Sequence, residues 1–316
     1  MVRIGFIGCH EISWFCLKKI CQCCSKYNDE VVLALDLEQA KASKYSASIN
    51  FDSLAREYNF ELFHVSSASD AQSIELLKKA KLDILFIIGW HRIVPQTVLA
   101  QAKIRLGIHS SLLPKDRGSS PINWQLIRGE RIGGITLFHL TDHVDSGNIV
   151  DSIEYEILDT DDVKDVYFKA TLCSLTLLEK NWPQIHDLNI NSLPQNDAEA
   201  TINQRRKPED GIIDWAKTAK NCYDWIRALT HPYPGAFTYW KGRKILIWES
   251  RILEEKETKP GEVISSDKRL IISTGKGSLE LLRLQIENEP ICNASIFSES
   301  YQLKKGDFFS SSNSKS

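Results

Sequence analysis

One stretch of the chain, residues 106–145, holds residues whose types and spacing suit proton transfer. It reads LGIHSSLLPKDRGSSPINWQLIRGERIGGITLFHLTDHVD. His109 follows a β-type apolar run at 104–108, and Asp145 lies in the polar loop after a second such run at 135–140. Strand ends meet at the carboxyl edge of a parallel sheet, where open α/β folds bind ligands. The spacing therefore predicts an imidazole that transfers a proton while a carboxylate orients it.

The surrounding sequence predicts the elements that would position these two residues. Short apolar runs at 2–7, 30–36, 62–65 and 82–89 alternate with segments of helical spacing. This alternation is typical of a doubly wound α/β fold with a mostly parallel sheet. The run at 82–89, LDILFIIG, is apolar at almost every position and should be a central strand. A GxGxxG motif is missing after the first strand, so a dinucleotide site is not predicted.

Composition and charge exclude several classes of protein. The chain has 316 residues, 42% hydrophobic and 25% charged, with a formal net charge of −2. A protein that grips nucleic acid usually carries a basic face, which this balance does not require. No apolar run is long enough for a membrane span, and the N-terminal MVRIGFIG enters a strand without the pattern of a signal peptide. We therefore expect a cytoplasmic protein whose partners include neither nucleic acid nor membrane.

The length of the chain fits two domains. Residues 189–207 are polar and show no regular pattern, which predicts a linker after a first domain at 1–188. One helical stretch at 215–229 and several short strands fit a small open barrel at 208–303. The serine-rich residues 304–316 predict a disordered tail.

Eight cysteines, five of them at positions 9–24, admit two interpretations. Cys21 and Cys24 form a CxxC pair, but a zinc site needs two more ligands nearby, and the other cysteines are scattered. The segment at 12–24 also has helical spacing, with its thiols near one face. We therefore expect a helix whose cysteines pack on the sheet as small apolar side chains, and no metal site.

Two motifs make the chain similar to a known family. HSSLLPKDRGSSP at 109–121 and DSGNIV at 145–150 resemble the signature of the folate-dependent formyltransferases. HPYPGAFTYWKGRKILIWESRI at 231–252 resembles the second domain of longer members, above all the enzyme that formylates a UDP-linked aminoarabinose. The likeness covers roughly residues 1–285. It implies a Rossmann-type formyltransferase domain followed by an OB-like β domain.

The resemblance implies roles for individual residues. N10-formyltetrahydrofolate would donate the formyl group, and His109 would move a proton between the attacking amine and the folate nitrogen. Asp145 would raise the basicity of His109 and hold its tautomer. The backbone of a short turn at 92–94 and of a polar loop at 141–144 would bind the pterin ring. The folate-binding candidates are Trp90, Arg92, Ile93, Val94, Thr141, Asp142, His143, Val144 and Ser119, which stands where some members have an arginine.

Gly107 departs from the family pattern. Members usually have Asn-x-His, whose Asn amide donates to the formyl oxygen as that oxygen gains negative charge, but Gly107 stands two residues before His109. Losing one such donor can slow a reaction by about 100- to 1000-fold. Three interpretations stay open: a backbone N–H or a water replaces the amide, Asn123 or Ser110 replaces it, or the site is weak or inactive. Arg117 leaves a similar choice, because it could bind an anion or brace its loop.

Together these features predict an enzyme that transfers a formyl group from N10-formyltetrahydrofolate to a primary amine on a UDP- or dTDP-linked amino sugar. In methionyl-tRNA formyltransferases, the region corresponding to residues 40–50 resembles a basic insertion that handles tRNA. Residues 40–50 of this chain contain no such basic insertion, which favours a small acceptor. The alternatives are methionyl-tRNA formyl transfer, hydrolysis of formyl-folate, and a non-catalytic protein that binds folate or a nucleotide sugar. A homodimer stays open, because no surface patch in the sequence indicates one.

Overall fold

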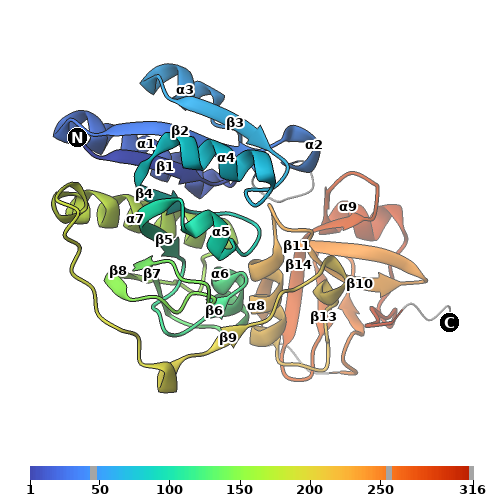
Figure 1. Cartoon of the computed structure of the whole chain (residues 1–316). Coiled ribbons are helices and arrows are strands. Elements are labelled where there is room, and N and C mark those ends of the chain that lie inside the picture. Colours follow the sequence, from blue (N-terminus) through green and yellow to red (C-terminus); the bar gives the residue numbers. More distant parts are fainter. Residues whose placement is uncertain (43–47, 254–257, 313–316) are drawn as a thin grey trace. The chain divides into compact units, whose positions relative to one another are not determined.

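The chain folds into two compact units, each built from several segments (Figure 1). The computed structural model describes residues 1–42, 48–253 and 258–312. The first unit comprises residues 1–121, 132–156 and 167–204, and the second unit comprises residues 122–131, 157–166 and 205–316.

The observed division differs from the expected domain boundaries in two places. Residues 122–131 and 157–166, which the sequence assigns to the first domain, group with the second unit. Most of the expected linker at 189–207 groups with the first unit. Backbone pairing places the linker there, because the short strand Ile202–Asn203 (β9) runs parallel to Arg117–Gly118 (β6) of the first unit. A segment without regular pattern in the sequence is thus anchored beside the predicted site.

A seven-stranded sheet forms the centre of the first unit. Its order is β3-β2-β1-β4-β5-β7-β8; the first five strands pair in parallel, and the last two pairings, β5 with β7 and β7 with β8, are antiparallel. This confirms the predicted doubly wound, mostly parallel α/β fold. β4 lies in the middle, as its nearly unbroken apolar sequence predicts, because a central parallel strand is buried on both faces. The strands are β1 Arg3–Ile7, β2 Glu30–Leu37, β3 Glu61–Val65, β4 Leu82–Ile87, β5 Ala102–His109, β7 Ile132–His139 and β8 Ile149–Glu156.

Helices connect and flank these strands (Figure 1). α1, Glu11–Tyr27, ends at Asn28, which adopts a left-handed conformation with a φ of 58°, as is common after a helix. α4, Ala71–Ala80, begins after Asp70, whose side chain accepts a hydrogen bond from a backbone N–H of the first turn. Within the described ranges, no helix is both long and apolar enough to cross a membrane. The other helices are α2 Gln39–Ala42, α3 Asp52–Tyr58, α5 Gln96–Leu99, α6 Pro121–Arg128 and α7 Val163–His186.

The thiols of α1 pack inward, as the helical spacing predicts. Cys16, Cys21, Cys23 and Cys24 are all buried. Burial raises the pKa of Cys23 to about 11 and the pKa of Cys21 to about 12, so both thiols stay protonated and unreactive near neutral pH. The packing interpretation of these cysteines is therefore confirmed. In the described part of the chain, no group of three or more histidine, cysteine or acidic side chains could hold a metal ion.

The second unit is built on an antiparallel sheet. Its order is β10-β11-β14-β13-β12, and β15 adds to β14. One main helix, α8 (Ala219–Leu229), packs against β11. The arrangement agrees with the predicted small, barrel-like domain. The strands are β10 Ala236–Trp240, β11 Arg243–Leu253, β12 Val263–Ser265, β13 Leu270–Ser273, β14 Ser278–Ile286 and β15 Cys292–Asn293, with a final helix α9 at Ala294–Ser300.

α8 begins later than the helix predicted at 215–229. Thr218 caps it, because its Oγ1 accepts a hydrogen bond from the backbone N–H of Asn221. Trp215 is buried outside the helix and donates a hydrogen bond from Nε1 to Oγ1 of Thr238. The helix was predicted to start too early because Trp215, a buried apolar residue outside the helix, happens to fit the helical spacing of residues 219–229.

The C-terminal segment corrects a second expectation. The predicted disordered tail at 304–316 is ordered over 304–312, while residues 313–316 lie outside the described ranges. Ser310 pairs with Tyr239 through two backbone hydrogen bonds. Phe309 is 2% exposed, and its ring centroid lies 6.4 Å from that of Trp215. Burial of this one large apolar side chain stabilises an ordered path for a segment that is otherwise rich in serine.

Candidate active site

His109 is the last residue of β5, at the carboxyl end of the parallel strands. It pairs with Thr136 of the antiparallel β7. The residue is 9% exposed, and its ring lies edge-on to Phe138 with 6.5 Å between ring centroids. The histidine therefore occupies the edge of the sheet where open α/β folds bind ligands.

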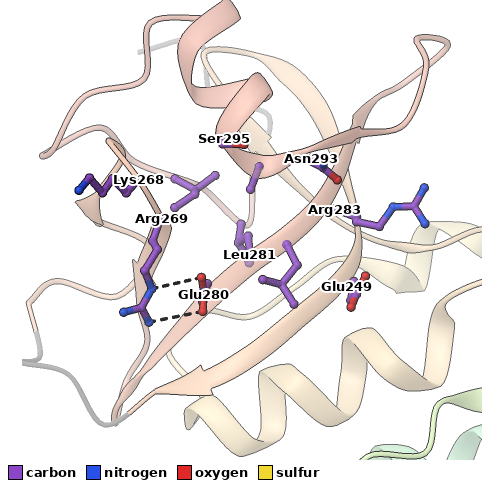
Figure 2. Close-up of a pocket in the computed structure, with 11 residues that line it drawn as sticks. Glu249, Lys268, Arg269, Glu280, Leu281, Arg283, Asn293 and Ser295 are labelled. Carbon is purple, nitrogen blue, oxygen red and sulfur yellow. Dashed lines mark hydrogen bonds and ion pairs between the residues drawn. The ribbon is translucent and has the colours of Figure 1, made fainter.

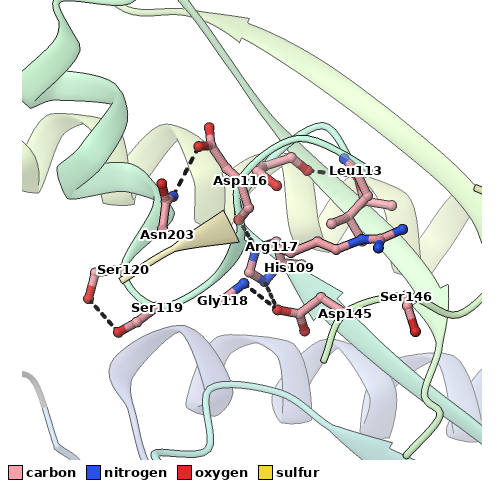
Figure 3. Close-up of polar contacts among 12 residues, drawn as sticks. His109, Leu113, Asp116, Arg117, Gly118, Ser119, Ser120, Asp145, Ser146 and Asn203 are labelled. Carbon is pink, nitrogen blue, oxygen red and sulfur yellow. Dashed lines mark hydrogen bonds and ion pairs between the residues drawn. The ribbon is translucent and has the colours of Figure 1, made fainter. Parts of the chain in front are cut away.

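Both ring nitrogens of His109 face oxygen atoms (Figure 3). Nε2 lies 2.7 Å from the carbonyl oxygen of Asp116, and Nδ1 lies 3.6 Å from Oδ2 of Asp145. Because a carbonyl oxygen can only accept a hydrogen bond, Nε2 carries the hydrogen and donates it. Nδ1 is then the nitrogen that can exchange a proton. It faces the carboxylate across a gap longer than a direct hydrogen bond.

Three structural features fix the position of Asp145 beside His109. Asp145 has a φ of 48°, in the left-handed region that aspartate tolerates better than most residues. Its Oδ2 also accepts a hydrogen bond of 2.8 Å from the backbone N–H of Gly118. Gly147 allows the loop to pass close to the end of β7, because a Cβ at this position would lie 1.7 Å from the carbonyl oxygen of His139. The structure thus brings the two predicted catalytic side chains together.

Leu140 occupies the space that a side chain at position 107 would need. Gly107 lies in β5 between Ile87 of β4 and Phe138 of β7. A Cβ built on Gly107 would lie 2.7 Å from Cδ2 of Leu140 and 3.3 Å from the carbonyl oxygen of Ile87. An asparagine would therefore not fit here without a shift of Leu140. Leu140 thus fills the space that the asparagine side chain would need at position 107.

The two side chains considered as substitutes for that amide behave differently. Asn123 belongs to the second unit, where it is 2% exposed and donates a hydrogen bond of 2.7 Å from Nδ2 to the carbonyl oxygen of Ala228. This contact gives Asn123 a structural role within that unit. Ser110 follows His109 directly and is half-buried, so it stays a candidate.

The first pterin-binding candidates lie in an irregular segment after β4. Trp90 and Val94 are half-buried and pack against an apolar cluster that also contacts Leu140. Arg92 and Ile93 are exposed. In the described residues, no hydrogen bond uses the backbone N–H groups of 92–94. Apolar side chains beside unused backbone donors fit the expected recognition of a flat heterocycle by backbone atoms.

Residues 141–144 form the second candidate segment, an exposed loop before Asp145. The hydroxyls of Thr141 and Ser146 both donate to the carbonyl oxygen of His143, which restrains the loop. The side chains of Asp142 and His143 are 64% and 85% exposed. These two side chains are therefore directed to solvent, and any contact from this loop to a ligand falls to its backbone.

Arg117 braces its surroundings instead of presenting a free cation. The residue is 8% exposed. Its Nε and Nη2 donate to Oε1 of Gln195 at 3.0 and 2.7 Å, and Nη2 also pairs with Asp197 at 2.7 Å. The partners are side chains of the expected linker, and not the loop carbonyls that the sequence led us to consider. Ser119 is also tied to this segment, because its backbone N–H donates to the carbonyl oxygen of Asn203.

The sequence did not predict the role of several residues near the site, among them Leu140, Gln195, Thr201 and Asn203. Leu140 ends an apolar run, and its position beside Gly107 depends on how two strands pair. The other three are polar residues in a segment without periodicity. Such a segment carries no pattern that separates a hydrogen-bonded side chain from a solvated one.

A separate hollow of about 330 Å³ lies in the second unit (Figure 2). β11, β13 and β14 line it together with the start of α9. Arg269 and Glu280 form an ion pair in its wall, with 3.2 Å between Nε and Oε1. None of the site residues predicted from the sequence lines this hollow.

Two parts of the chain match models of known protein families. Residues 2–173 match the family described as formyl transferase, and residues 205–302 match the formyl transferase C-terminal domain. The bifunctional polymyxin resistance protein ArnA of Wigglesworthia glossinidia brevipalpis is 35% identical over 295 residues, which are 92% of this chain and 44% of that protein. A methionyl-tRNA formyltransferase of Streptococcus suis is 31% identical over 75% of this chain and 76% of its own. The chain thus spans less than half of the ArnA relative.

Solved structures share the fold at lower sequence identity. An N-formyltransferase from Helicobacter canadensis, in complex with folinic acid and dTDP-3-aminofucose, has a TM-score of 0.69 and 20% identity over 89% of this chain and 99% of its own. HypX from Aquifex aeolicus, in complex with tetrahydrofolic acid, has a TM-score of 0.67 and 18% identity over 98% of this chain and 50% of its own.

Proposed function

The chain belongs to the formyl transferase family, and from this premise we propose that it transfers a formyl group from N10-formyltetrahydrofolate to a primary amine on a nucleotide-linked amino sugar. The observation that carries the proposal is the position of His109, with Nε2 on the Asp116 carbonyl and Nδ1 facing Asp145 at the ligand-binding edge of the sheet. An imidazole held at one nitrogen, with the other facing a carboxylate, suits proton transfer at an amine.

The reaction moves one proton while one bond forms and another breaks. The neutral amine nitrogen attacks the formyl carbon to form the new C–N bond, and the bond from that carbon to N10 of the folate breaks. Nδ1 of His109 takes the proton from the attacking nitrogen and passes it to the departing N10. Asp145 stabilises the imidazolium between these events, while the Asp116 carbonyl holds the ring through Nε2.

The formyl oxygen needs a hydrogen-bond donor other than residue 107. Negative charge develops on this oxygen during attack, and a positioned donor there contributes strongly to catalysis. Leu140 fills the space beside Gly107, so the donor is a backbone N–H, an ordered water or the hydroxyl of Ser110. Each of these replaces an amide without requiring room at position 107.

The folate is held mainly by backbone groups in this proposal. Trp90 and Val94 supply an apolar wall, and the N–H groups of 92–94 meet the polar edge of the pterin ring. The loop at 141–144 covers the other side through its backbone, and Ser119 offers one hydroxyl where an arginine would add a charge. The folate supplies the activated formyl group, and the protein supplies orientation and proton transfer.

Two observations support a nucleotide-linked amino sugar as the acceptor. The N-formyltransferase from Helicobacter canadensis, which shares the fold, was solved in complex with dTDP-3-aminofucose. The net charge of −2 and the absence of a basic insertion near residues 40–50 favour a small acceptor over tRNA, although residues 43–47 lie outside the described ranges.

A mass-spectrometric assay tests the proposal directly. The protein and N10-formyltetrahydrofolate are mixed with a panel of UDP- and dTDP-linked amino sugars. We expect one acceptor to gain the mass of one formyl group, and we expect His109→Ala to abolish the gain. Asp187→Asn serves as a control, because Asp187 is an exposed carboxylate of the first unit outside the site. The proposal fails if no acceptor is formylated, or if the His109→Ala protein is as active as the wild type.

Methionyl-tRNA formyl transfer is the second candidate, because the Streptococcus suis relative matches this chain over 76% of its own length. The same assay with initiator methionyl-tRNA discriminates the two. Formylation of the tRNA, weakened by added salt as expected for phosphate contacts, would replace the sugar nucleotide as acceptor. Turnover of formyl-folate with neither acceptor would point to hydrolysis.

A further inference from the structure

We infer that Gln195, Thr201 and Asn203 form a brace that positions His109 for catalysis from outside the site. The inference rests on the proposed function, since the brace acts only through His109. Residues 195–203 bind both loops that face the two nitrogens of His109. All of these residues belong to the first unit. The three side chains touch neither reacting partner, so they are positioning residues and not catalytic ones.

Gln195 ties Arg117 to the loop that carries Asp145. Its Oε1 accepts two hydrogen bonds from Arg117, at 3.0 and 2.7 Å. Its Nε2 donates to the carbonyl oxygens of Asp145 and Gly147, at 2.8 and 2.7 Å. The orientation of the amide is fixed, because the guanidinium can only donate and the two carbonyls can only accept. A single carboxamide thus fixes the backbone on both sides of the DSG turn.

Thr201 and Asn203 hold the other loop. Oγ1 of Thr201 accepts a 2.8 Å hydrogen bond from the backbone N–H of Asp116. Nδ2 of Asn203 donates to Oδ1 of Asp116 at 3.0 Å (Figure 3). Gly118 lets the two segments approach, since a Cβ on it would lie 2.7 Å from the carbonyl oxygen of Asn203. Asp116 is the residue whose own carbonyl receives the hydrogen of His109 Nε2.

Both aspartates beside His109 are held in an unfavourable backbone conformation. Asp116 has a φ of 60° and Asp145 a φ of 48°, in the left-handed region that non-glycine residues seldom adopt. Such conformations persist when surrounding contacts over-determine them. Here the contacts come from the brace, through Thr201 and Asn203 on one aspartate and Gln195 on the other. Loss of the brace would release the carbonyl and the carboxylate that orient the imidazole.

The test observes the imidazole itself and needs no acceptor. Full-length protein labelled with [¹⁵N]histidine is studied by NMR, with His109 assigned through the signal that His109→Ala removes. In the wild type we expect an Nε2–H proton that exchanges slowly because the Asp116 carbonyl binds it. Thr201→Val removes the acceptor for Asp116 N–H, while Thr201→Ser keeps it. We expect the first variant to lose the slow Nε2–H signal and the second to retain it.

Gln195→Glu probes the other half of the brace. The variant keeps an oxygen for Arg117 but places a second carboxylate oxygen against the carbonyls of Asp145 and Gly147, where the native amide donates. We expect it to shift the His109 ring signals. Asn191→Ala is the control, because Asn191 lies in the same segment with its side chain exposed. It should leave these signals unchanged.

Kinetics gives a second readout once the acceptor is known. Displacement of a catalytic group by about 1 Å can cost on the order of 100-fold in rate, so we expect kcat to fall about 10- to 100-fold in Thr201→Val and Gln195→Glu, with KM for the folate little changed. Should Gln195→Glu fail to fold, the pair at Thr201 decides alone. The brace is refuted if Thr201→Val and Thr201→Ser give the same His109 spectrum. That result would leave the proposed formyl transfer intact.

Discussion

Two histidines in the first unit lie at strand ends and face aspartates, yet their surroundings differ. His64 in β3 has Asp36 at 2.5 Å from Nδ1 and Asp52 at 3.3 Å from Nε2. His109 has one carboxylate at 3.6 Å and one carbonyl at 2.7 Å. Two carboxylates engage both nitrogens of His64 as donors and favour its charged form. A carbonyl and a more distant carboxylate engage one nitrogen of His109 and leave the other able to gain and lose a proton.

The difference teaches that proximity to an acidic residue does not by itself make a catalytic histidine. Burial lowers the pKa of His64, but the hydrogen bond to Asp36 and the charges of Asp36 and Asp52 outweigh it, so the pKa is raised overall. Burial also raises the pKa of Asp36, although its contact with His64 opposes this. His64 and its two aspartates therefore hold β2, β3 and the start of α3 together. His109 instead keeps one nitrogen that can take up and release a proton.

The largest expected effect separates the two histidines by activity. His109→Ala should lower kcat/KM for formyl transfer by about 100- to 10,000-fold, because general acid–base catalysis contributes on this scale. His64→Ala should leave the rate close to that of the wild type under conditions where the protein is folded. Steady-state kinetics with the identified acceptor measures both. Equal losses in the two variants would contradict the distinction between a catalytic and an anchoring histidine.

Asp145→Asn should give the next largest effect. The amide oxygen can still accept from Gly118 N–H, but the negative charge facing Nδ1 of His109 is lost. We expect kcat to fall about 10- to 1000-fold, with thermal stability close to that of the wild type. Single-turnover kinetics isolates the chemical step. An unchanged single-turnover rate would show that Asp145 is not needed to stabilise the imidazolium.

Gly107→Asn tests how crowded the His109 face of β5 is. The added side chain meets Leu140 and the Ile87 carbonyl, so we expect a loss of about 1–3 kcal/mol in the free energy of unfolding, as for other overpacked positions. Adding Leu140→Ala should relieve part of that loss, which makes the two changes non-additive. Urea unfolding of both single variants and the double variant measures the coupling. Simple additivity would mean that Leu140 does not fill the space in question.

The smallest effect concerns the stability provided by His64. Because its pKa in the folded state is raised above the unfolded value of about 6.5, the charged histidine stabilises the fold fully below that value. This contribution disappears as the pH rises through the raised pKa. His64→Gln should therefore reduce stability most at low pH, by less than about 1 kcal/mol because the side chain is 45% exposed. The free energies of unfolding of the variant and of the wild type, measured at several pH values, should converge above the raised pKa of His64. A difference that does not change with pH would contradict this.

The elements that position the site could be predicted because burial leaves a pattern in the sequence. β4 is apolar at almost every position, and a strand of this kind belongs in the centre of a parallel sheet. His109 and Asp145 could be located by their motifs and by the rule that ligands bind at the carboxyl edge. The boundaries were less accurate, because Trp215 and Phe309 bury apolar area without belonging to a helix or a long strand.

The parts that escaped prediction depend on polar contacts between distant segments. Gln195 makes four hydrogen bonds to three residues, yet its neighbours in sequence are those of any solvated linker. The sequence could not decide whether Arg117 binds an anion or braces its loop, because a sequence shows the charge of a side chain but not its partners. Leu140 gave no signal beside Gly107, because the two meet only through the pairing of β5 with β7.

The order in which the ribosome delivers the chain gives the β6–β9 pairing a consequence in time. Asp116 is made 85 residues before Thr201, the residue that its backbone N–H binds. At roughly 5–20 residues per second, this interval lasts about 4 to 17 s. The sheet and His109 can form during that period, but the loops around the histidine lack their partners. A nascent chain that ends before residue 195 would therefore contain His109 and Asp145 but lack the contacts that align them. These contacts would form only after residues 195–203 have been made.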